Sequence, residues 1–294
     1  MVKFRVMIVA IALIMLLLLA TSLHYEEQKP RMVDKDLVRK FLEAQYVPEA
    51  GLLRAATLEG IEDSHRIYVA ADNLLAARAL AVLKSPISSI ILTTLNKEYN
   101  GGFDELHEVL LGVKIPDKFY CRYNKYLGNV SSSKFGSLEI YYEKPNRSCI
   151  IENWDRYADL VVYKALNALL HGSRPYAEQL FSILISMWDG YGFKDGAYNG
   201  SYETYKVALA IYLYKALKAA NSDLVEKHVD LYKKWNMILA LMQRSDGGIV
   251  THYKVSKRGE IIPVGDANTE TTSITALALY SEYPRRIGEH CKCS

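Results

Sequence analysis

A motif that recurs four times constrains the fold of this chain more than any other feature. In each copy a glycine-containing turn is followed by an acidic or amide residue, which opens a helix-forming segment. Imperfect repeats of this kind indicate one supersecondary unit stacked on copies of itself. The unit is predicted to be a helical hairpin. The copies are Gly51–Leu53 leading to Asp72–Leu80, Asn100–Phe103 leading to Asn153–Tyr157, Gly190–Phe193 leading to Tyr202–Tyr205, and Asp246–Ile249 leading to Asn268–Thr271.

The spacing of apolar residues predicts a mainly α domain over residues 34–283, with eight helices that would form four hairpins. Residues 101–150 differ, because aromatic residues alternate with polar ones at 119–126 and 138–142. We interpret this segment as an inserted β-hairpin, and as a candidate cover over a site. A further β-excursion or long loop is expected at 249–265.

The N-terminus predicts export. Residues 1–5 carry two positive charges and form an n-region on the cytosolic side, and residues 6–23 contain no charged side chain. A segment of this length nearly crosses a hydrocarbon core of about 30 Å, and the positive flank places the rest of the chain outside the cell. The segment is therefore predicted to be a membrane anchor, with secretion after cleavage near Ser22 as the alternative. Residues 24–33 are a polar linker.

Composition excludes some functions and permits others. Half of the residues are hydrophobic and 23% are charged, which is enough for a sizeable core. A net charge of +3, dispersed along the chain, argues against nucleic-acid binding. Export permits disulfides, and Cys121 and Cys149 are the favoured pair because they flank a strand-like segment. Residues 284–294 form a tail with Cys291 and Cys293, for which a local or intermolecular bridge is favoured over metal binding.

Segments 245–249 (Ser-Asp-Gly-Gly-Ile) and 266–272 (Asp-Ala-Asn-Thr-Glu-Thr-Thr) resemble the connection between consecutive helices in the (α/α) toroid superfamilies. These include the six-hairpin glycosidases, related polysaccharide lyases and sugar epimerases, and the terpenoid cyclase toroids. The resemblance extends over about residues 34–283 and implies an incomplete or small toroid, because four hairpins are counted where complete toroids commonly have six or seven. In such folds alternate helices line the interior, and their starts converge at one end.

The repeat places carboxylates near four of these helix starts, and paired carboxylates are what glycoside hydrolysis needs. His252 and nearby tyrosines offer the bases that lyases use, and aromatic rings in the same loops could stack on sugars. The sequence has no HExxH, phosphate-loop or GxSxG motif, so no metal or cofactor is expected. The predicted catalytic residues are Asp72, Asp155, Glu203, Glu270 and His252, and the predicted substrate-binding residues are Trp154, Tyr191, Phe193, Tyr202, Tyr205 and Tyr253.

The leading hypothesis is an exported, membrane-anchored protein that acts on or binds extracellular carbohydrate, as a glycoside hydrolase or a lyase. An alternative is a non-catalytic extracellular scaffold or binding module, because acids at helix starts also offset the helix dipole. A third hypothesis is an isoprenoid-handling toroid, which would have an apolar cavity with few carboxylates. The substrate and the oligomeric state are left open.

Overall fold

The computed structural model describes residues 32–282. Helices account for about half of these residues, and three small β-sheets account for much of the remainder, so the expected mainly α fold holds only in part. The eight α-helices of the described residues agree in number with the prediction. They are α2 (Lys35–Ala44), α3 (Leu74–Val82), α4 (Ile87–Glu98), α5 (Ala158–Leu170), α6 (Arg174–Ser186), α7 (Thr204–Ala219), α8 (Val229–Met242) and α9 (Thr269–Tyr280).

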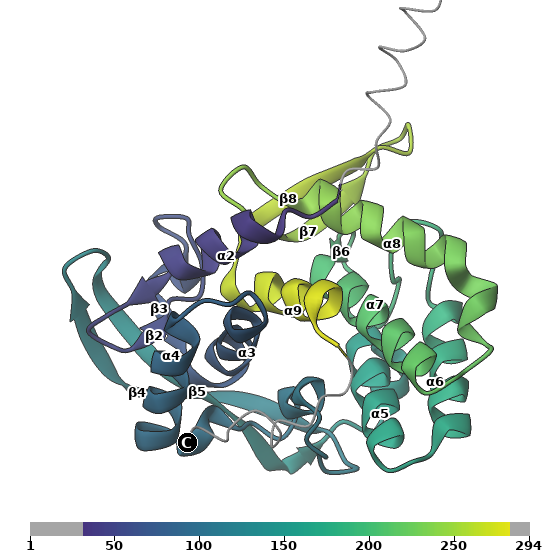
Figure 1. The fold of residues 1–294 in the computed structure, drawn as a ribbon, viewed down its shortest axis with the longest axis horizontal. Helices are drawn as coiled ribbons and strands as arrows, with labels where there is room; N and C mark the ends of the chain where they lie inside the picture. Colours follow the sequence, from purple (N-terminus) through teal and green to yellow (C-terminus); the bar gives the residue numbers. More distant parts are fainter. Residues whose placement is uncertain (1–31, 283–294) are drawn as a thin grey trace, which may run out of the picture. The chain divides into compact units, whose positions relative to one another are not determined.

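The helices form an inner arc and an outer layer (Figure 1). In the inner arc α3 packs on α9, α9 on α7, and α7 on α5. In the outer layer α4, α6 and α8 each pack on the inner helix that precedes them, and α2 packs on α9. The 3₁₀ segment η4 (His107–Leu111) contacts both α3 and α5, so it bridges the two ends of the arc.

Side-chain pattern explains which helices are inside. Helices α7 and α9 bury residues on every face, which suits elements surrounded by other helices. Helix α2 instead buries only Val38, Phe41 and Leu42, a single stripe, and it begins where the Asp34 carboxylate accepts hydrogen bonds from the N–H groups of Asp36 and Leu37. The hydroxyl of Tyr280 donates to the carbonyl of Val33, which fastens the last helix to the first.

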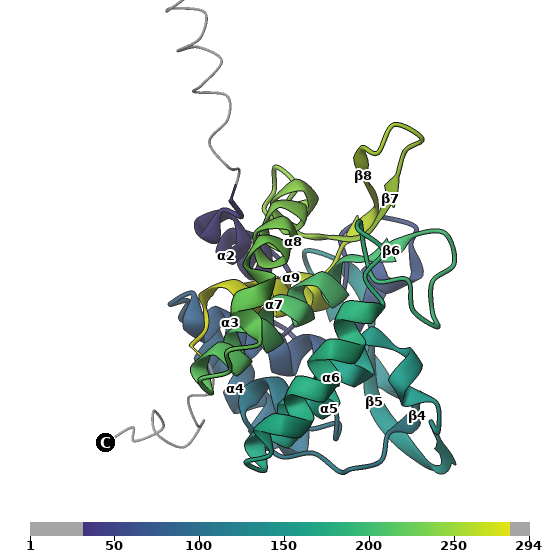
Figure 2. The same ribbon diagram turned by 90° about the vertical axis from the view of Figure 1, so that its right-hand side faces the viewer.

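The strands gather on one side of the helical layers (Figure 2). Strands β1 (Tyr46–Val47) and β2 (Leu52–Leu53) form one antiparallel pair. Strands β6 (Tyr202–Glu203), β7 (Val250–Val255) and β8 (Ile261–Ala267) form an antiparallel sheet in that order. Because β6 runs directly into α7, and Asn268 alone separates β8 from α9, this sheet lies beside the starts of two inner helices.

The predicted β-hairpin is present and is longer than expected. Strand β4 (Tyr120–Ser132) pairs antiparallel with β5 (Gly136–Ile150), and β3 (Arg66–Tyr68) adds to β5 in parallel. Lys134 at the turn donates to the carbonyl of Ala44, so the turn lies near α2, while the open end lies near α5 (Figure 1). The predicted disulfide between Cys121 and Cys149 is confirmed, and it links the two strands at this open end.

The anchor or signal segment 6–23 and the tail 284–294 lie outside the described residues. Within residues 32–282, no helix has the length and apolar character needed to span a membrane.

Candidate active site

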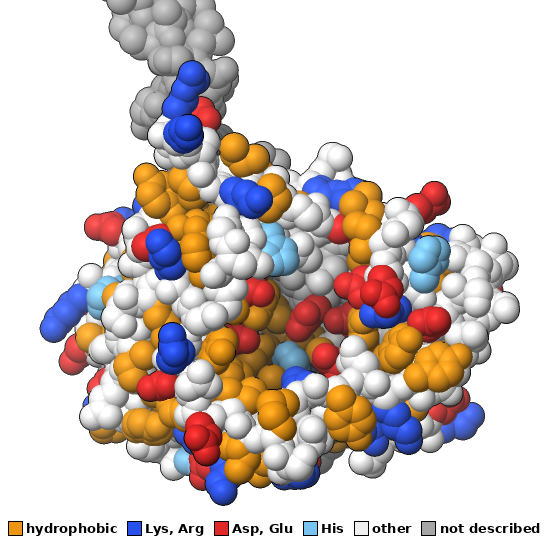
Figure 3. Space-filling view, turned by 180° about the vertical axis from the view of Figure 1, so that it is seen from behind, with side chains coloured by type: hydrophobic (Ala, Val, Ile, Leu, Met, Phe, Trp, Pro, Cys, Tyr) orange, Lys and Arg blue, Asp and Glu red, His pale blue; other side chains and the backbone are white. Residues whose placement is uncertain are grey.

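A cavity of about 200 Å³ lies where α3 and α9 begin, beside the β3–β5–β4 sheet. Four carboxyl groups line it, and no lysine or arginine does. We call it the carboxylate cavity. The face of the molecule in Figure 3 is hollowed at its centre, where acidic side chains and a histidine gather. The residues that line the cavity are Ala55, Asp63, Tyr68, Asp72, Asn124, Glu143, Asn268 and Glu270.

Asp72 is held in the cavity by a distorted backbone. The chain enters α3 through a kinked segment, η2 (Val69–Asn73), in which Ala70 and Ala71 have non-helical backbone angles and Ala71 has a φ of 50°. A non-glycine residue in this region costs on the order of 1–3 kcal/mol, and such strain concentrates at functional sites. The buried Asn73 side chain holds the segment in place, because its amide donates to the carbonyls of Leu53 and Tyr68 and its oxygen accepts from the Leu53 N–H.

The Asp72 side chain is not a helix cap. It is 6% exposed, and among residues 32–282 it has no hydrogen-bond partner. Burial raises the pKa of Asp72 well above its ordinary value, and the charges of Glu270 and Glu143 raise it further. Burial likewise raises the pKa of Glu143, which faces the same cavity from β5. The cavity therefore favours the protonated form of both carboxyl groups.

Glu270 is more exposed than Asp72 and lies beside a histidine. The cap of α9 is supplied by Asn268, whose side chain accepts a 2.8 Å hydrogen bond from the Thr271 N–H, so Glu270 is free to face the cavity. Its Oε1 lies 3.5 Å from Nε2 of His107. Burial alone would lower the pKa of His107, but the charge of Asp104 and hydrogen bonds to Asp104 and Glu270 raise it well above its ordinary value. The resulting imidazolium lies beside the Glu270 carboxyl group.

The His107 ring is fixed by a chain of ionic contacts. Its Nδ1 lies 2.6 Å from Oδ2 of Asp104, and the guanidinium of Arg122 donates to the same oxygen at 2.8 Å. Burial raises the pKa of Asp104, but the His107 and Arg122 contacts outweigh it and hold that pKa well below the ordinary value. Contacts thus run from Arg122 to Asp104, from Asp104 to His107 and from His107 to Glu270, and they hold the His107 ring beside the Glu270 carboxyl group.

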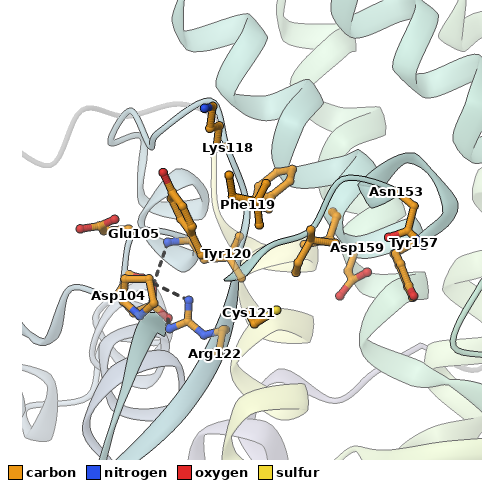
Figure 4. Close-up of a pocket in the computed structure, with 15 residues that line it drawn as sticks. Asp104, Glu105, Lys118, Phe119, Tyr120, Cys121, Arg122, Asn153, Tyr157 and Asp159 are labelled. Atoms are coloured by element: carbon orange, nitrogen blue, oxygen red, sulfur yellow. Dashed lines mark hydrogen bonds and ion pairs between the residues drawn. The ribbon is translucent and has the colours of Figure 1, made fainter. Parts of the chain in front are cut away.

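A second and larger cavity, of about 460 Å³, lies at the open end of the β4–β5 hairpin (Figure 4). We call it the hairpin pocket. The rings of Phe119, Tyr120 and Tyr157 line it together with Arg122 and Asp159. Asp104 also lines this pocket, and Asp104 contacts His107. His107 in turn contacts Glu270 of the carboxylate cavity, so these two residues connect the pocket with the cavity.

Glu203 lies in an ion-pair network rather than in either cavity. It contacts Lys206, whose Nζ also lies 2.7 Å from Oδ2 of Asp195. The Lys206 side chain is 3% exposed, so the lysine is a buried structural counter-ion for two carboxylates. Tyr205 from the same helix donates a 3.0 Å hydrogen bond to Asp159, a lining residue of the hairpin pocket.

The remaining predicted site residues lie elsewhere among the described residues. Asp155 is exposed in the 3₁₀ segment η5 (Trp154–Arg156), outside both cavities. His252 is on β7, where its Nδ1 lies 2.9 Å from the Thr251 hydroxyl. Trp154 packs edge-on against Phe119, at 6.0 Å between ring centroids.

The aromatic residues predicted to bind substrate mainly make contacts within the protein. Phe193 and Tyr253 are buried, and Phe193 contacts Trp188 and Trp235. Tyr202 stacks on Tyr253 and donates to Asp189. Tyr191 is exposed, and its carbonyl accepts a hydrogen bond from the hydroxyl of Tyr253.

Sequence reasoning missed Asp104, His107, Arg122 and Glu143. The segment Phe103–Glu108 contains three acids and a histidine directly after the Gly101-Gly102 turn of the second repeat, and this density was the available signal. Glu143 and Arg122 are on strands whose inward faces cannot be assigned without the register. The described residues contain no cluster of His, Cys, Asp and Glu side chains that could hold a metal ion.

Comparison with protein families, with curated proteins and with solved structures finds no match for this chain.

Proposed function

We propose that the chain is a glycoside hydrolase, with Asp72 as the general acid and Glu270 as the partner carboxylate. One observation carries the proposal. Asp72 and Glu270 line one cavity, in which burial favours the protonated form of Asp72 while Glu270 lies with its Oε1 3.5 Å from Nε2 of His107. Two carboxyl groups in one cavity with such different surroundings suit the two roles of an acid–base pair.

The proposed reaction gives Asp72 and Glu270 different roles. As the bond between the anomeric carbon and the glycosidic oxygen breaks, Asp72 gives its proton to that oxygen, and the leaving sugar departs as an alcohol. The positive charge that develops on the sugar ring is stabilised by the carboxylate of Glu270. Water supplies the hydroxyl that ends on the anomeric carbon, and its remaining proton returns to the carboxyl pair. His107 holds the Glu270 carboxylate in position throughout.

The charge of the cavity supports a neutral or positively charged sugar. Its lining has four carboxyl groups and no basic side chain, so the carboxylate of a uronic acid would find no positively charged partner there. A polysaccharide lyase needs such an acid and a base to abstract the neighbouring proton. Tyr68 is the cavity's tyrosine, and burial raises its pKa to about 12, which makes it a poor base at neutral pH. Hydrolysis is therefore favoured over elimination.

The acids also favour hydrolysis over the other two hypotheses. An isoprenoid-handling protein is expected to have an apolar cavity, which a lining of four carboxyl groups argues against. A binding module has no use for a carboxyl group that burial drives toward its protonated form, whereas a general acid needs one. The raised pKa of Asp72, beside a strained Ala71, therefore favours catalysis.

The fold and the location are part of the proposal. The two-layer helical arc supports an incomplete (α/α) toroid, in which the starts of the inner helices α3 and α9 supply Asp72 and Glu270. The Cys121–Cys149 disulfide supports export, since disulfides persist mainly in oxidising compartments. We propose that residues 6–23 anchor the protein in a membrane with the folded part outside the cell.

The test is hydrolysis of a panel of neutral and amino-sugar polysaccharides, measured by release of reducing ends. Asp72→Asn and Glu270→Gln should each lower kcat ~10²–10⁴-fold on a hydrolysed polymer, without lowering the thermal midpoint. Glu203→Gln is the matched control, since Glu203 contacts Lys206 rather than the cavity, and it should retain activity. Absence of hydrolysis across the panel, or full activity of Asp72→Asn, would contradict the proposal.

A further inference from the structure

We propose that one face of the β4–β5 hairpin is an extended groove that binds a glycan chain on both sides of the carboxylate cavity, so that the chain is cut internally. The inference rests on the proposed hydrolase activity and names its substrate class: an oligosaccharide or polysaccharide of neutral or amino sugars, with at least one ring bound on each side of the cleaved bond.

The strand register puts three features on the same face. Side chains two residues apart in a strand point to the same side. Arg122 pairs with Pro145, and both line the hairpin pocket. Two residues further along each strand, Asn124 pairs with Glu143, and both line the carboxylate cavity. The hairpin pocket and the carboxylate cavity are therefore consecutive positions on one surface, ~7 Å apart along the hairpin.

The same face continues on the other side of the cavity as a row of tyrosines. Tyr126 pairs with Tyr141, two residues beyond the Asn124–Glu143 pair, and Tyr141 pairs with Tyr68 of β3. The ring centroids of Tyr126 and Tyr141 are 5.6 Å apart, and those of Tyr141 and Tyr68 are 6.0 Å apart. Tyr68 itself lines the carboxylate cavity, so the tyrosine row begins at the cavity wall.

The opposite face of β5 serves the core instead. Leu138 and Tyr142 are buried, and the Tyr142 hydroxyl donates to the carbonyls of Tyr99 and Phe103. The groove side chains are thus turned away from the core. From the Pro145 pair to the Tyr141 pair the groove extends ~13 Å, at ~3.4 Å per residue.

The chemistry along the groove suits a sugar chain. Tyrosine and phenylalanine rings present flat apolar surfaces to the C–H faces of sugars, and tyrosine hydroxyls can also bond to sugar hydroxyls. Tyr126 is 51% exposed, which leaves its ring available. In the hairpin pocket, Phe119 and Tyr120 supply rings, and Arg122 and Asp159 supply polar groups (Figure 4). Rings therefore lie on both sides of the acids that perform the cleavage.

The test uses the full chain carrying Glu270→Gln, so that binding is measured without turnover. The probes are β-1,4-linked glucose and β-1,4-linked glucosamine oligosaccharides of one to six sugars, titrated by calorimetry. Affinity for one series should rise with each added sugar up to at least three. In the same background Tyr126→Ala should weaken binding of the hexasaccharide ~10-fold and leave the monosaccharide unchanged. Tyr123→Ala is the matched control, because Tyr123 is 49% exposed on the same strand but points to the other face.

The hairpin pocket has its own pair of variants. Asn153 is exposed and lines the pocket, whereas the neighbouring Glu152 is exposed and does not. Asn153→Trp should fill the pocket and lower hexasaccharide affinity, and Glu152→Trp should not. The proposed groove would be contradicted if affinity did not depend on the number of sugars, or if each groove variant behaved as its control. This holds even when the wild-type protein hydrolyses the polymer. Failure of hydrolysis by the wild-type chain, together with failure of both series to bind, would instead overturn the proposed function.

Discussion

Replacement of Asp72 by asparagine should stabilise the protein increasingly as the pH rises. The folded-state pKa of Asp72 lies well above the ordinary value of 3.8, because burial and the Glu270 charge oppose ionisation. Between 3.8 and that raised pKa, the folded protein keeps a proton that the unfolded chain releases. Unfolding is therefore favoured as pH rises through this window, by ~1.4 kcal/mol for each pH unit. Asparagine cannot ionise, so the variant escapes this loss.

The magnitude can be worked out without the folded pKa. Two pH units above 3.8, at pH 5.8, the variant should gain at most ~2.3 kcal/mol on the wild type relative to their difference at pH 3.8, because half of the unfolded carboxyl groups are already ionised at pH 3.8. For a domain of this size ~1 kcal/mol corresponds to ~2–4 °C in the thermal midpoint. Differential scanning calorimetry at several pH values would measure the change.

The control is Asp34→Asn. Asp34 is a true N-cap that accepts hydrogen bonds at 2.9 and 3.0 Å from Asp36 and Leu37, and asparagine caps helices equally well. This variant keeps the cap and should therefore match the wild type in stability at pH 7. The reasoning about Asp72 would be refuted if Asp72→Asn lost stability by the ~0.5–2 kcal/mol of a broken cap, or if its difference from the wild type did not change with pH.

Three further perturbations concern buried groups and the disulfide. Burial and the Asp104 charge raise the pKa of Glu108 to about 7, so stability is lost as pH rises from 4.5 to 7, and Glu108→Gln should be more stable than the wild type at pH 8 by up to ~3 kcal/mol in chemical denaturation. Replacement of Cys121 and Cys149 by serine opens a loop with a sequence separation of 28 and should cost ~3–4 kcal/mol, with an unchanged midpoint under reducing conditions arguing against the disulfide. Lys206→Met leaves two carboxylates without their buried partner and should cost ~3–5 kcal/mol, and a cost below ~1 kcal/mol would show that the ion pair is not structural.

The helices could be predicted because their signals are local. Asp34 before an apolar stripe predicted the start of α2, and Asn268 before Thr269 predicted the start of α9. Each predicted start lies within about a residue of the observed one. The repeat also indicated that Asp72 and Glu270 share a position at helix starts, and the structure brings both to one cavity. Periodicity and capping depend on neighbours in sequence, so they survive without tertiary information.

The rest of the site depends on contacts that no local pattern encodes. Glu203 has the same place in the repeat as Glu270, but Lys206 three residues later holds it in an ion pair. Glu143 faces the cavity because β5 pairs with β3 and β4 in one register, and a shift by one residue would turn it to the core. His107 reaches Glu270 across a sequence separation that only the folded arc closes.

The most direct test of the central claim is the dependence of Asp72→Asn on the leaving group. A general acid is needed to protonate a poor leaving group such as a sugar hydroxyl, and is hardly needed for dinitrophenolate. Asp72→Asn should lower kcat/KM ~10²–10⁴-fold on an unactivated oligosaccharide, but less than ~10-fold on the dinitrophenyl glycoside of the same sugar. An equal loss on both substrates would show that Asp72 does not donate the proton, and the proposed mechanism would be wrong.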